Sequence, residues 1–292
     1  MVSVVQLGTI DYATGLGLQQ QLVALRKEEK IGDVLLLLEH KPVITLGRNA
    51  KAANVLASPE LLKKRGVEVC ECDRGGDVTF HGPGQIVGYP IFDLRSRAGA
   101  DAVVRLAESK TRPDPPRKSM GVIEFVRKLE DVLIRTCADS GIPTKRVQGL
   151  TGVWTNPELA SAHVGAEPLV RPAERSSTTA EAKLAAIGVH ISRSVTSHGF
   201  ALNVKTDLSF FDLIVPCGIT TKPVSSMQKE LGRELDLNTV AESISRNFGV
   251  VFQSQILWVE SLHALLGQTV GVPMKRPAEL RHLHKEDETF WV

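Results

Sequence analysis

The sequence has little cysteine, little net charge and no long apolar run. Four cysteines among 292 residues are too few and too scattered for a disulfide framework, so we expect free thiols. The 35 lysines and arginines nearly balance the 33 aspartates and glutamates. Because the basic residues are spread among acids, this pattern argues against a nucleic-acid-binding surface, although it is compatible with an acidic protein partner.

Targeting signals and membrane spans are also missing from the sequence. No apolar run approaches ~18 residues, the length that a membrane span requires. The N-terminal stretch MVSVVQLGTIDYATG has neither a basic region followed by an apolar one nor an Arg/Ser-rich amphipathic pattern. The composition, 42% hydrophobic and 23% charged, is ordinary for a soluble globular protein. We therefore expect a cytoplasmic protein without a membrane span.

Strand-like and helix-like segments alternate along the chain. Strands are predicted for VSVVQLG, DVLLLLEH, VITLG, VEVCECD, TGVWT, LAAIGVHIS and GFALNV. Helices are predicted at about 12–30, at 58–62, from 119 to about 138, near 225–231 and at 238–247. This mixed order predicts an α+β (mixed α/β) fold in which helices cover the sheets.

Two stretches interrupt the alternation, at about 95–118 and at 156–180. Both are rich in Pro, Ala, Ser and charged residues and have weak periodicity, so neither could bury a core of its own. We interpret them as surface insertions in one domain that spans residues 1–255. Residues 256–292 are expected to form a C-terminal extension.

A glycine-rich run, RGGDVTFHGPGQ, follows the strand predicted at VEVCECD. Dense glycines allow the main chain to approach a ligand closely, and their N–H groups can face a carbonyl or an anion. A pair of tight β-turns explains the same composition equally well. The run is not a phosphate-binding P-loop, because the lysine and hydroxyl residue that should follow it are absent.

Cys217, in the stretch VPCG, is either a nucleophile or a small apolar side chain in a turn. Lys183 opens an apolar strand, and a protonated lysine beside the thiol would favour the thiolate. Backbone N–H groups near Gly218 or in the Gly75–Gly76 turn could hold an oxyanion. His81 and His198 are alternative bases, so a Cys-His pair stays open at this point.

No metal site is expected from the remaining cysteines. Cys70 and Cys72 alternate within VEVCECD and lack a second Cys/His pair at suitable spacing, so packing explains them better than metal binding.

Four stretches together resemble the lipoyl(octanoyl) transferase family: RGGDVTFHGPGQIVGYPIFDLR, GVWT, KLAAIGVHISRSVTSHGFALNV and DLSFFDLIVPCGI. The resemblance covers about residues 5–250 apart from the two insertions. It implies the fold of a biotin/lipoate protein ligase-like catalytic domain, which is a mixed sheet flanked by helices.

The resemblance also implies an activity. The protein would transfer an octanoyl group from octanoyl-acyl carrier protein, through a thioester on Cys217, to a lysine of lipoyl domains. This is protein lipoylation, the first step of endogenous lipoate synthesis. The acceptors would be 2-oxoacid dehydrogenases and the glycine cleavage H protein. Lys183 would stabilise the thiolate and act as acid and base. No metal, ATP or other cofactor is implied, and we expect a monomer.

The residues that the resemblance assigns to the substrate pocket fall into three groups. They are Arg74, Gly75, Gly76, Asp77, Val78, Thr79, Phe80 and His81; Ala186, Ile187 and Gly188; and Gly199, Phe200 and Ala201.

Two other functions remain open at this stage. An ATP-dependent lipoate or biotin protein ligase would make an acyl-adenylate and would need no nucleophilic cysteine. A noncatalytic acyl-binding module would share the fold, but Cys217, Lys183 and His81 all stand at motif positions, which argues against it.

Overall fold

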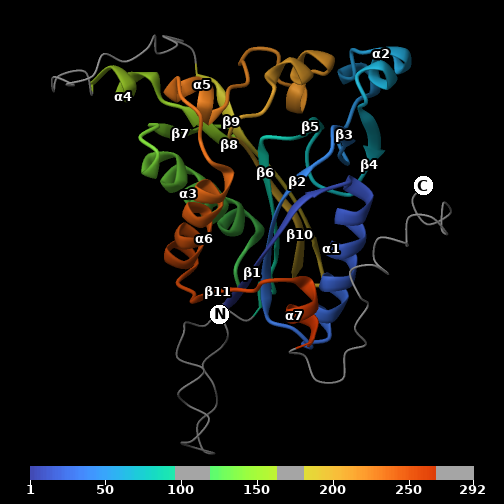
Figure 1. Cartoon of the computed structure of the whole chain (residues 1–292), viewed down its shortest axis with the longest axis vertical. Helices are drawn as coiled ribbons and strands as arrows, with labels where there is room; N and C mark the ends of the chain where they lie inside the picture. The colour runs from blue at the N-terminus through green and yellow to red at the C-terminus, as the bar shows by residue number, and fades with distance from the viewer. Residues whose placement is uncertain (96–118, 163–180, 268–292) are drawn as a thin grey trace, which may run out of the picture.

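The computed structural model describes residues 1–95, 119–162 and 181–267. Eight strands form a mixed sheet in the order β11-β1-β2-β6-β10-β9-β8-β7 (Figure 1). β1 runs parallel to β2 and β11, and the other neighbours are antiparallel. The strands are β1 (Val2–Ile10), β2 (Asp33–His40), β6 (Gln85–Ile91), β7 (Thr144–Val147), β8 (Leu150–Thr155), β9 (Lys183–Ser192), β10 (Val195–Asn203) and β11 (Ile256–Trp258).

A smaller sheet has the order β4-β3-β5. Its strands are β3 (Val43–Leu46), β4 (Glu68–Glu71) and β5 (Val78–His81), with β3 parallel to β4 and antiparallel to β5. The helices are α1 (Tyr12–Lys27), α2 (Pro59–Lys64), α3 (Val122–Asp139), α4 (Pro157–Ala162), α5 (Met227–Leu231), α6 (Leu237–Phe252) and α7 (Leu262–Gly267). Short 3₁₀ helices cover Ala52–Asn54, Leu208–Leu213 and Pro216–Gly218.

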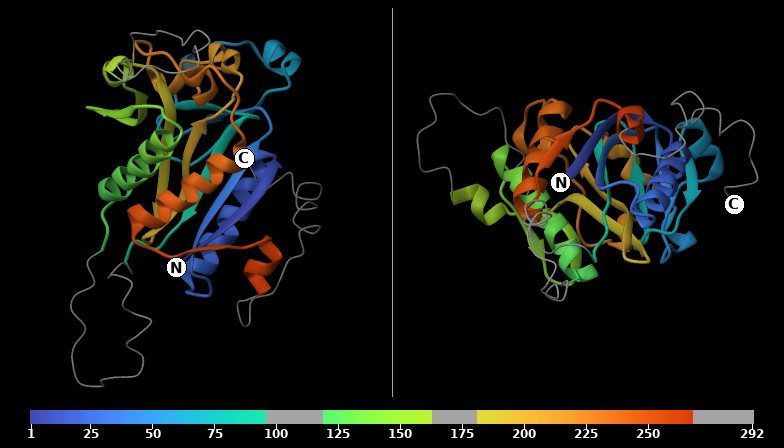
Figure 2. Two further views of the ribbon diagram at one scale, coloured as in Figure 1. Left: turned by 60° about the vertical axis from the view of Figure 1, so that its left-hand side comes forward. Right: turned by 90° about the horizontal axis from the view of Figure 1, so that it is seen from below.

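Helices cover both faces of the large sheet, and the strand β2 shows why. Leu35 and Leu37 pack in one core with α3 and α6, whereas Leu36 and Leu38 pack in a second core with α1 and α7. Because successive side chains point to opposite faces, a strand buried on both sides has a continuous apolar run such as VLLLL. Figures 1 and 2 show α3 and α6 side by side, and α1 and α7 on the other face.

Local signals fix where several helices begin. Asp11 caps α1 by accepting a hydrogen bond from Thr14 N, and Asp236 caps α6 in the same way from Thr239 N. Ser58 caps α2 just ahead of the proline at its first position. The expected helix at 238–247 extends further, to Phe252, because that side chain stacks on Phe248 in the core, with ring centroids 4.9 Å apart.

The chain does not leave the domain at residue 255, where we expected the C-terminal extension to begin. Ile256 pairs with Val2, so β11 adds a parallel strand to the edge of the sheet. Val259 and Leu262 are buried in the second core beside α1. Residues 256–267 therefore belong to the same domain, because their few apolar side chains complete a sheet edge and a core that lie far away in sequence.

The two expected insertions lie mostly outside the described residues, as does the chain after 267. The start of the second insertion is described, and Pro157–Ala162 forms the helix α4 where we expected irregular chain. None of the described helices combines the length and the apolar character needed to cross a bilayer.

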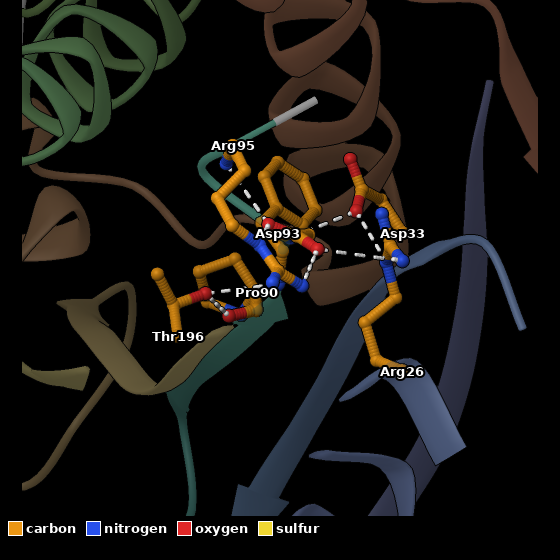
Figure 3. A network of polar contacts seen from close by, with 7 residues as sticks. Arg26, Asp33, Pro90, Asp93, Arg95 and Thr196 are labelled. Carbon is orange, nitrogen blue, oxygen red and sulfur yellow. Dashed lines mark hydrogen bonds and ion pairs between the residues drawn. The ribbon is translucent and has the colours of Figure 1, made fainter. Parts of the chain in front are cut away.

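A network of charged side chains joins α1, β2 and the end of β6 (Figure 3). Arg26 donates to Asp33 Oδ1 at 3.0 Å and lies 3.8 Å from Asp93 Oδ2. Arg95 contacts both carboxylate oxygens of Asp93, at 3.1 and 2.8 Å. Since Asp93 is buried, these partners compensate its charge and hold the chain at the point where the first insertion begins.

Candidate active site

Cys217 lies in a tight turn directly after a proline. Its backbone has φ 57° and ψ 20°, the left-handed conformation, and Gly218 follows with φ 69°. A left-handed backbone costs a non-glycine residue about 1–2 kcal/mol, so the surrounding structure must hold it. Val215 N donates to Asn54 O at 2.8 Å, which ties this turn to the 3₁₀ helix at 52–54.

Lys183 is the first residue of β9, and its side chain reaches the cysteine. The Lys183 Nζ lies 3.2 Å from Cys217 Sγ and 5.1 Å from the centroid of the Trp154 ring. Lys183 N donates to Pro223 O, and Ser225 N donates to Lys183 O. The backbone that follows the cysteine turn is thus paired with the residue that carries the lysine. The structure brings together the two residues that we expected to carry the chemistry.

Gly152, within the GVWT motif, leaves room for the lysine side chain. Its φ is 127°, and a Cβ at this position would lie 2.9 Å from Lys183 Cε and 2.5 Å from Ala185 O. Gly152 N donates to Glu130 Oε1, a carboxylate on α3 that is fully buried. This role could not be predicted from the sequence, because the contact depends on how β8 pairs with β9.

The two histidines that were open as alternative bases have other partners. His81 Nδ1 lies 2.7 Å from Gln85 Oε1, and His198 Nε2 lies 2.7 Å from Asp73 Oδ1. The hydrogen bond that the structure describes at Cys217 Sγ comes from Lys183. The geometry therefore favours a Cys-Lys pair over a Cys-His pair.

The hydrogen bonds around His81 fix its tautomer. Gln85 Nε2 donates to Phe80 O and to Asn203 Oδ1, so its amide oxygen faces His81 and accepts from Nδ1. Burial lowers the pKa of His81 to about 3, and repulsion from His40 contributes. The ring is neutral near pH 7, with Nε2 unprotonated and able to accept a hydrogen bond.

His40 is neutral for a similar reason. Burial lowers its pKa to about 4, and its Nε2 lies 2.6 Å from the Tyr89 hydroxyl. The pKa of Tyr89 is raised, chiefly by burial. Tyr89 also borders a cavity that lies beside Cys217, so the part of the cavity wall near Tyr89 and His81 carries uncharged polar groups.

The glycine-rich run does not line the cavity uniformly, which corrects the expectation from the sequence. Thr79 and His81 border the cavity, whereas Val78 and Phe80 are buried in a third core with Ile44. The run contains the strand β5, and the period of two in a strand sends alternate side chains to opposite faces.

Arg74 organises the turn beside it. Its buried guanidinium donates to Thr45 O, Gly75 O and Asp77 O at 2.7, 3.2 and 2.6 Å. A Cβ at Gly188 would lie 2.5 Å from Gly75 O, so the missing side chain allows the turn to lie against β9. The glycines therefore serve close packing of two backbone segments as well as access to the cavity.

Two of the N–H groups that we proposed for an oxyanion have acceptors within the chain. Gly218 N donates to Val215 O and Gly75 N donates to Val189 O, both at 3.1 Å. These two groups hold the turn and the loop in place, whereas an oxyanion site at the other N–H groups near Gly218 or in the Gly75–Gly76 turn stays a prediction.

A cavity of about 220 Å³ lies beside the Cys-Lys pair. It is bordered by twelve of the fourteen expected pocket residues, all but Val78 and Phe80. Sequence reasoning missed others, which come from α1, from β6, from around the β7–β8 turn and from the segment after Cys217: Tyr12, Val87, Tyr89, Gly149, Leu150, Thr151 and Ile219. The signal available for Val87, Tyr89 and Ile219 was their place within the quoted family motifs.

The fold and this site define the class of protein. Residues 11–110 and 114–249 match the family described as Lipoyl protein ligase A/B catalytic domain, and the chain belongs to this family. It is 55% identical over 287 residues to the octanoyltransferase of Koribacter versatilis, covering 98% of both chains. It is 52% identical to the octanoyltransferase of Acidobacterium capsulatum, covering 91% of this chain and 96% of that one. The family resemblance drawn from the sequence is confirmed.

Solved structures support the fold independently of sequence similarity. A bipartite lipoate protein ligase from Thermoplasma acidophilum superposes with a TM-score of 0.61 at 14% identity, covering 97% of this chain and 92% of that one. A lipoate-protein ligase A bound with ATP gives 0.58 at 13% identity, covering 98% and 95%. The predicted lipoate-ligase-like mixed sheet flanked by helices is confirmed.

Proposed function

We propose that this protein is an acyltransferase that moves an octanoyl group from acyl carrier protein, through a thioester on Cys217, to a lysine of a lipoyl domain. The observation that carries the proposal is the 3.2 Å contact between Lys183 Nζ and Cys217 Sγ beside a cavity lined largely by apolar and glycine residues. The similarity to octanoyltransferases over nearly the full chain supports the acyl group and the acceptor class.

The first step forms the acyl-enzyme. The Cys217 thiolate attacks the carbonyl carbon of the octanoyl thioester on the carrier's prosthetic arm, and the bond from that carbon to the carrier's sulfur breaks. Lys183, as an ammonium, stabilises the attacking thiolate and gives a proton to the departing sulfur. The carrier leaves as a free thiol, and the octanoyl group remains on Cys217.

The second step releases the product. The amine of the acceptor lysine attacks the Cys217 thioester, a C–N bond forms, and the C–S bond breaks. The neutral Lys183 amine left by the first step takes the proton that the acceptor nitrogen loses. The amide is more stable than the thioester, so the second step draws the transfer forward, and the Cys-Lys pair returns to its starting charges.

The cavity supplies binding for the acyl chain. Ile187, Phe200 and Ala201 contribute apolar surface along its length. Each buried methylene contributes about 0.8 kcal/mol, so an eight-carbon chain gains several kcal/mol from an apolar slot. The proposal also names the partners. The donor is octanoyl-acyl carrier protein, and the acceptors are the lipoyl domains of 2-oxoacid dehydrogenases and of the glycine cleavage H protein. The enzyme acts as a monomer.

The test is acylation of the purified protein by octanoyl-acyl carrier protein without ATP, followed by intact mass and peptide mapping. We expect one octanoyl group on Cys217, and its loss when a lipoyl domain is added. Cys217→Ala should abolish the adduct, whereas Cys72→Ser is a matched control at another partly buried thiol and should retain it.

Lys183 needs a separate comparison. Lys183→Arg keeps the positive charge but cannot exchange a proton near neutral pH, so it should form the thiolate yet transfer the acyl group slowly. Lys183→Met should lose both the stabilised thiolate and the acyl transfer. A protein that acylates lipoyl domains only with ATP and free octanoate, and equally well as Cys217→Ala, would be a ligase and would contradict the proposal.

A further inference from the structure

The cavity beside Cys217 is separated from a second, larger one by only two of the side chains that border them. The second is a groove of about 800 Å³ that runs between α1 and the segment Val69–Asp73. Tyr12 and His198 border both spaces, and no other described residue borders both. We call these two side chains the partition between the cavity and this groove.

Tyr12 is held in the partition by packing. It is 2% exposed, and its ring stacks on His81 at 6.1 Å and meets His40 edge-on at 5.1 Å. Its hydroxyl is buried and has the Cys72 thiol as a polar neighbour. Its pKa is raised, chiefly by burial and also by the neighbouring Tyr89 and Cys72, so the phenol is neutral. The ring contacts with His81 and His40 hold Tyr12 in place by its shape.

His198 is fixed from both sides. Its φ is 55°, which is rare for a residue other than glycine. Gln19 on α1 accepts a hydrogen bond from His198 N at 2.6 Å, and Asp73 contacts the ring at 2.7 Å. The backbone and the ring of His198 are therefore both held in place, so the side chain can act as a rigid part of the cavity wall.

The partition lies at the far end of the cavity from the nucleophile. Lys183 opens β9, and Ala186 and Gly188 follow along it with their partners Ala201 and Gly199. His198 pairs with the next residue, Val189. An acyl chain that starts at Cys217 and runs along these strands therefore ends at Tyr12 and His198.

We infer that Tyr12 and His198 close the acyl pocket and set the longest chain that it accepts. This inference rests on the proposed function. On its α1 side the groove beyond the partition is lined by the polar side chains of Gln19, Gln20 and Lys27 and by an apolar strip of Ala13, Leu16, Val23 and Ala24. Opening the partition would therefore give additional methylenes an apolar surface to occupy rather than water alone.

The experiment presents the enzyme with equimolar octanoyl-, dodecanoyl- and tetradecanoyl-acyl carrier protein and measures each thioester on Cys217 by intact mass. In the wild type the octanoyl adduct should dominate. Tyr12→Val should raise the ratio of dodecanoyl to octanoyl adduct about tenfold or more, since one apolar pocket wall decides whether added methylenes fit. His198→Asn should act in the same direction, because asparagine tolerates the positive φ but is shorter.

Two controls separate shape from general loosening. Tyr12→Phe keeps the ring and should keep the chain-length ratio. Val23→Ala enlarges the groove without touching the partition and should leave both the ratio and the octanoyl rate unchanged. Filling the groove in the opened variant, with Leu16→Trp added to Tyr12→Val, should restore the preference for octanoyl.

The outcomes are distinguishable. If the wild type takes octanoyl and tetradecanoyl groups equally well, or if folded Tyr12→Val and His198→Asn keep the wild-type ratio, the partition does not set chain length and the inference is wrong. A wild type without a chain-length preference refutes the inference even if a variant fails to fold, and each of the two variants tests the partition independently of the other. If Cys217 takes no acyl group from any carrier, the proposed function itself fails, and the inference fails with it.

Discussion

Lowering the pH from 7 to 5 should destabilise this protein through its two buried histidines. His81 and His40 have pKa values of about 3 and about 4 in the folded chain, and burial is the main cause of both. In the unfolded chain both return to about 6.5. Between these limits the unfolded state binds protons that the folded state does not, so the free energy of unfolding falls as the pH falls.

The magnitude follows from the size of the pH window. Each histidine lowers the free energy of unfolding by about 1.4 kcal/mol per pH unit below 6.5. At pH 5 each has therefore lowered it by about 2 kcal/mol, and the pair by roughly 4 kcal/mol. Carboxylates act in a different range. Asp73 and Glu181 have pKa values of about 2, because of hydrogen bonds from His198 and from Lys145, and they lose stabilising charge only below about pH 4.

The assay is urea unfolding at pH 7, 6 and 5, followed by fluorescence of the buried Trp154. His40→Gln and His81→Gln should each remove about half of the pH dependence, because glutamine does not titrate. His263→Gln, at an exposed histidine on α7, is the matched control and should leave the dependence unchanged. A loss below about 1 kcal/mol between pH 7 and pH 5, or an unaltered dependence in both buried-site variants, would refute the reasoning.

Three further predictions concern the catalytic pair. Gly152→Ala places a methyl group 2.5 Å from Ala185 O and 2.9 Å from Lys183 Cε at a φ of 127°, so we expect about 2–3 kcal/mol of destabilisation and a loss of acylation of roughly a hundredfold, measured as the single-turnover rate. A wild-type rate in a folded variant would show that the lysine has room to move. Cys217→Gly relieves the left-handed strain that Cys217→Ala keeps, so the glycine variant should be about 1 kcal/mol more stable than the alanine variant in urea unfolding. Equal midpoints would mean that the turn is not strained. Glu130→Ala leaves the Gly152 N–H without its acceptor and removes one of the two ion pairs of Arg146, which should cost about 2–3 kcal/mol in the same measurement. Glu130→Gln should recover part of this loss, and identical stabilities of the two variants would contradict the role assigned to the carboxylate.

The sequence predicted the elements well where a local rule controls them. The strand predicted at DVLLLLEH is β2, and the helix predicted at 58–62 is α2, which begins after its Ser58 cap. The boundary at residue 255 was wrong, because β11 is a three-residue strand that exists only by pairing with β1. Its local composition carries too little periodicity to predict it.

For the site, the order of motifs was enough to nominate Cys217 and Lys183, and periodicity could have corrected the pocket. The strand period of two separates Thr79 and His81 from Val78 and Phe80, a distinction that the expectation for this run did not use. Tyr12 could not have been assigned, since its role depends on the packing of α1 against strands that follow it by many residues.

By itself the sequence determined seven of the eleven described strands, most of the helices and the family, because these depend on residue spacing, on helix signals and on contiguous motifs. Only the tertiary structure decided that a lysine and a cysteine 34 positions apart lie 3.2 Å from each other, and that Gly152 leaves room for the lysine beside Trp154. The reason is that strand pairing and sheet twist bring distant residues to one place, and no local pattern along the chain records that distance.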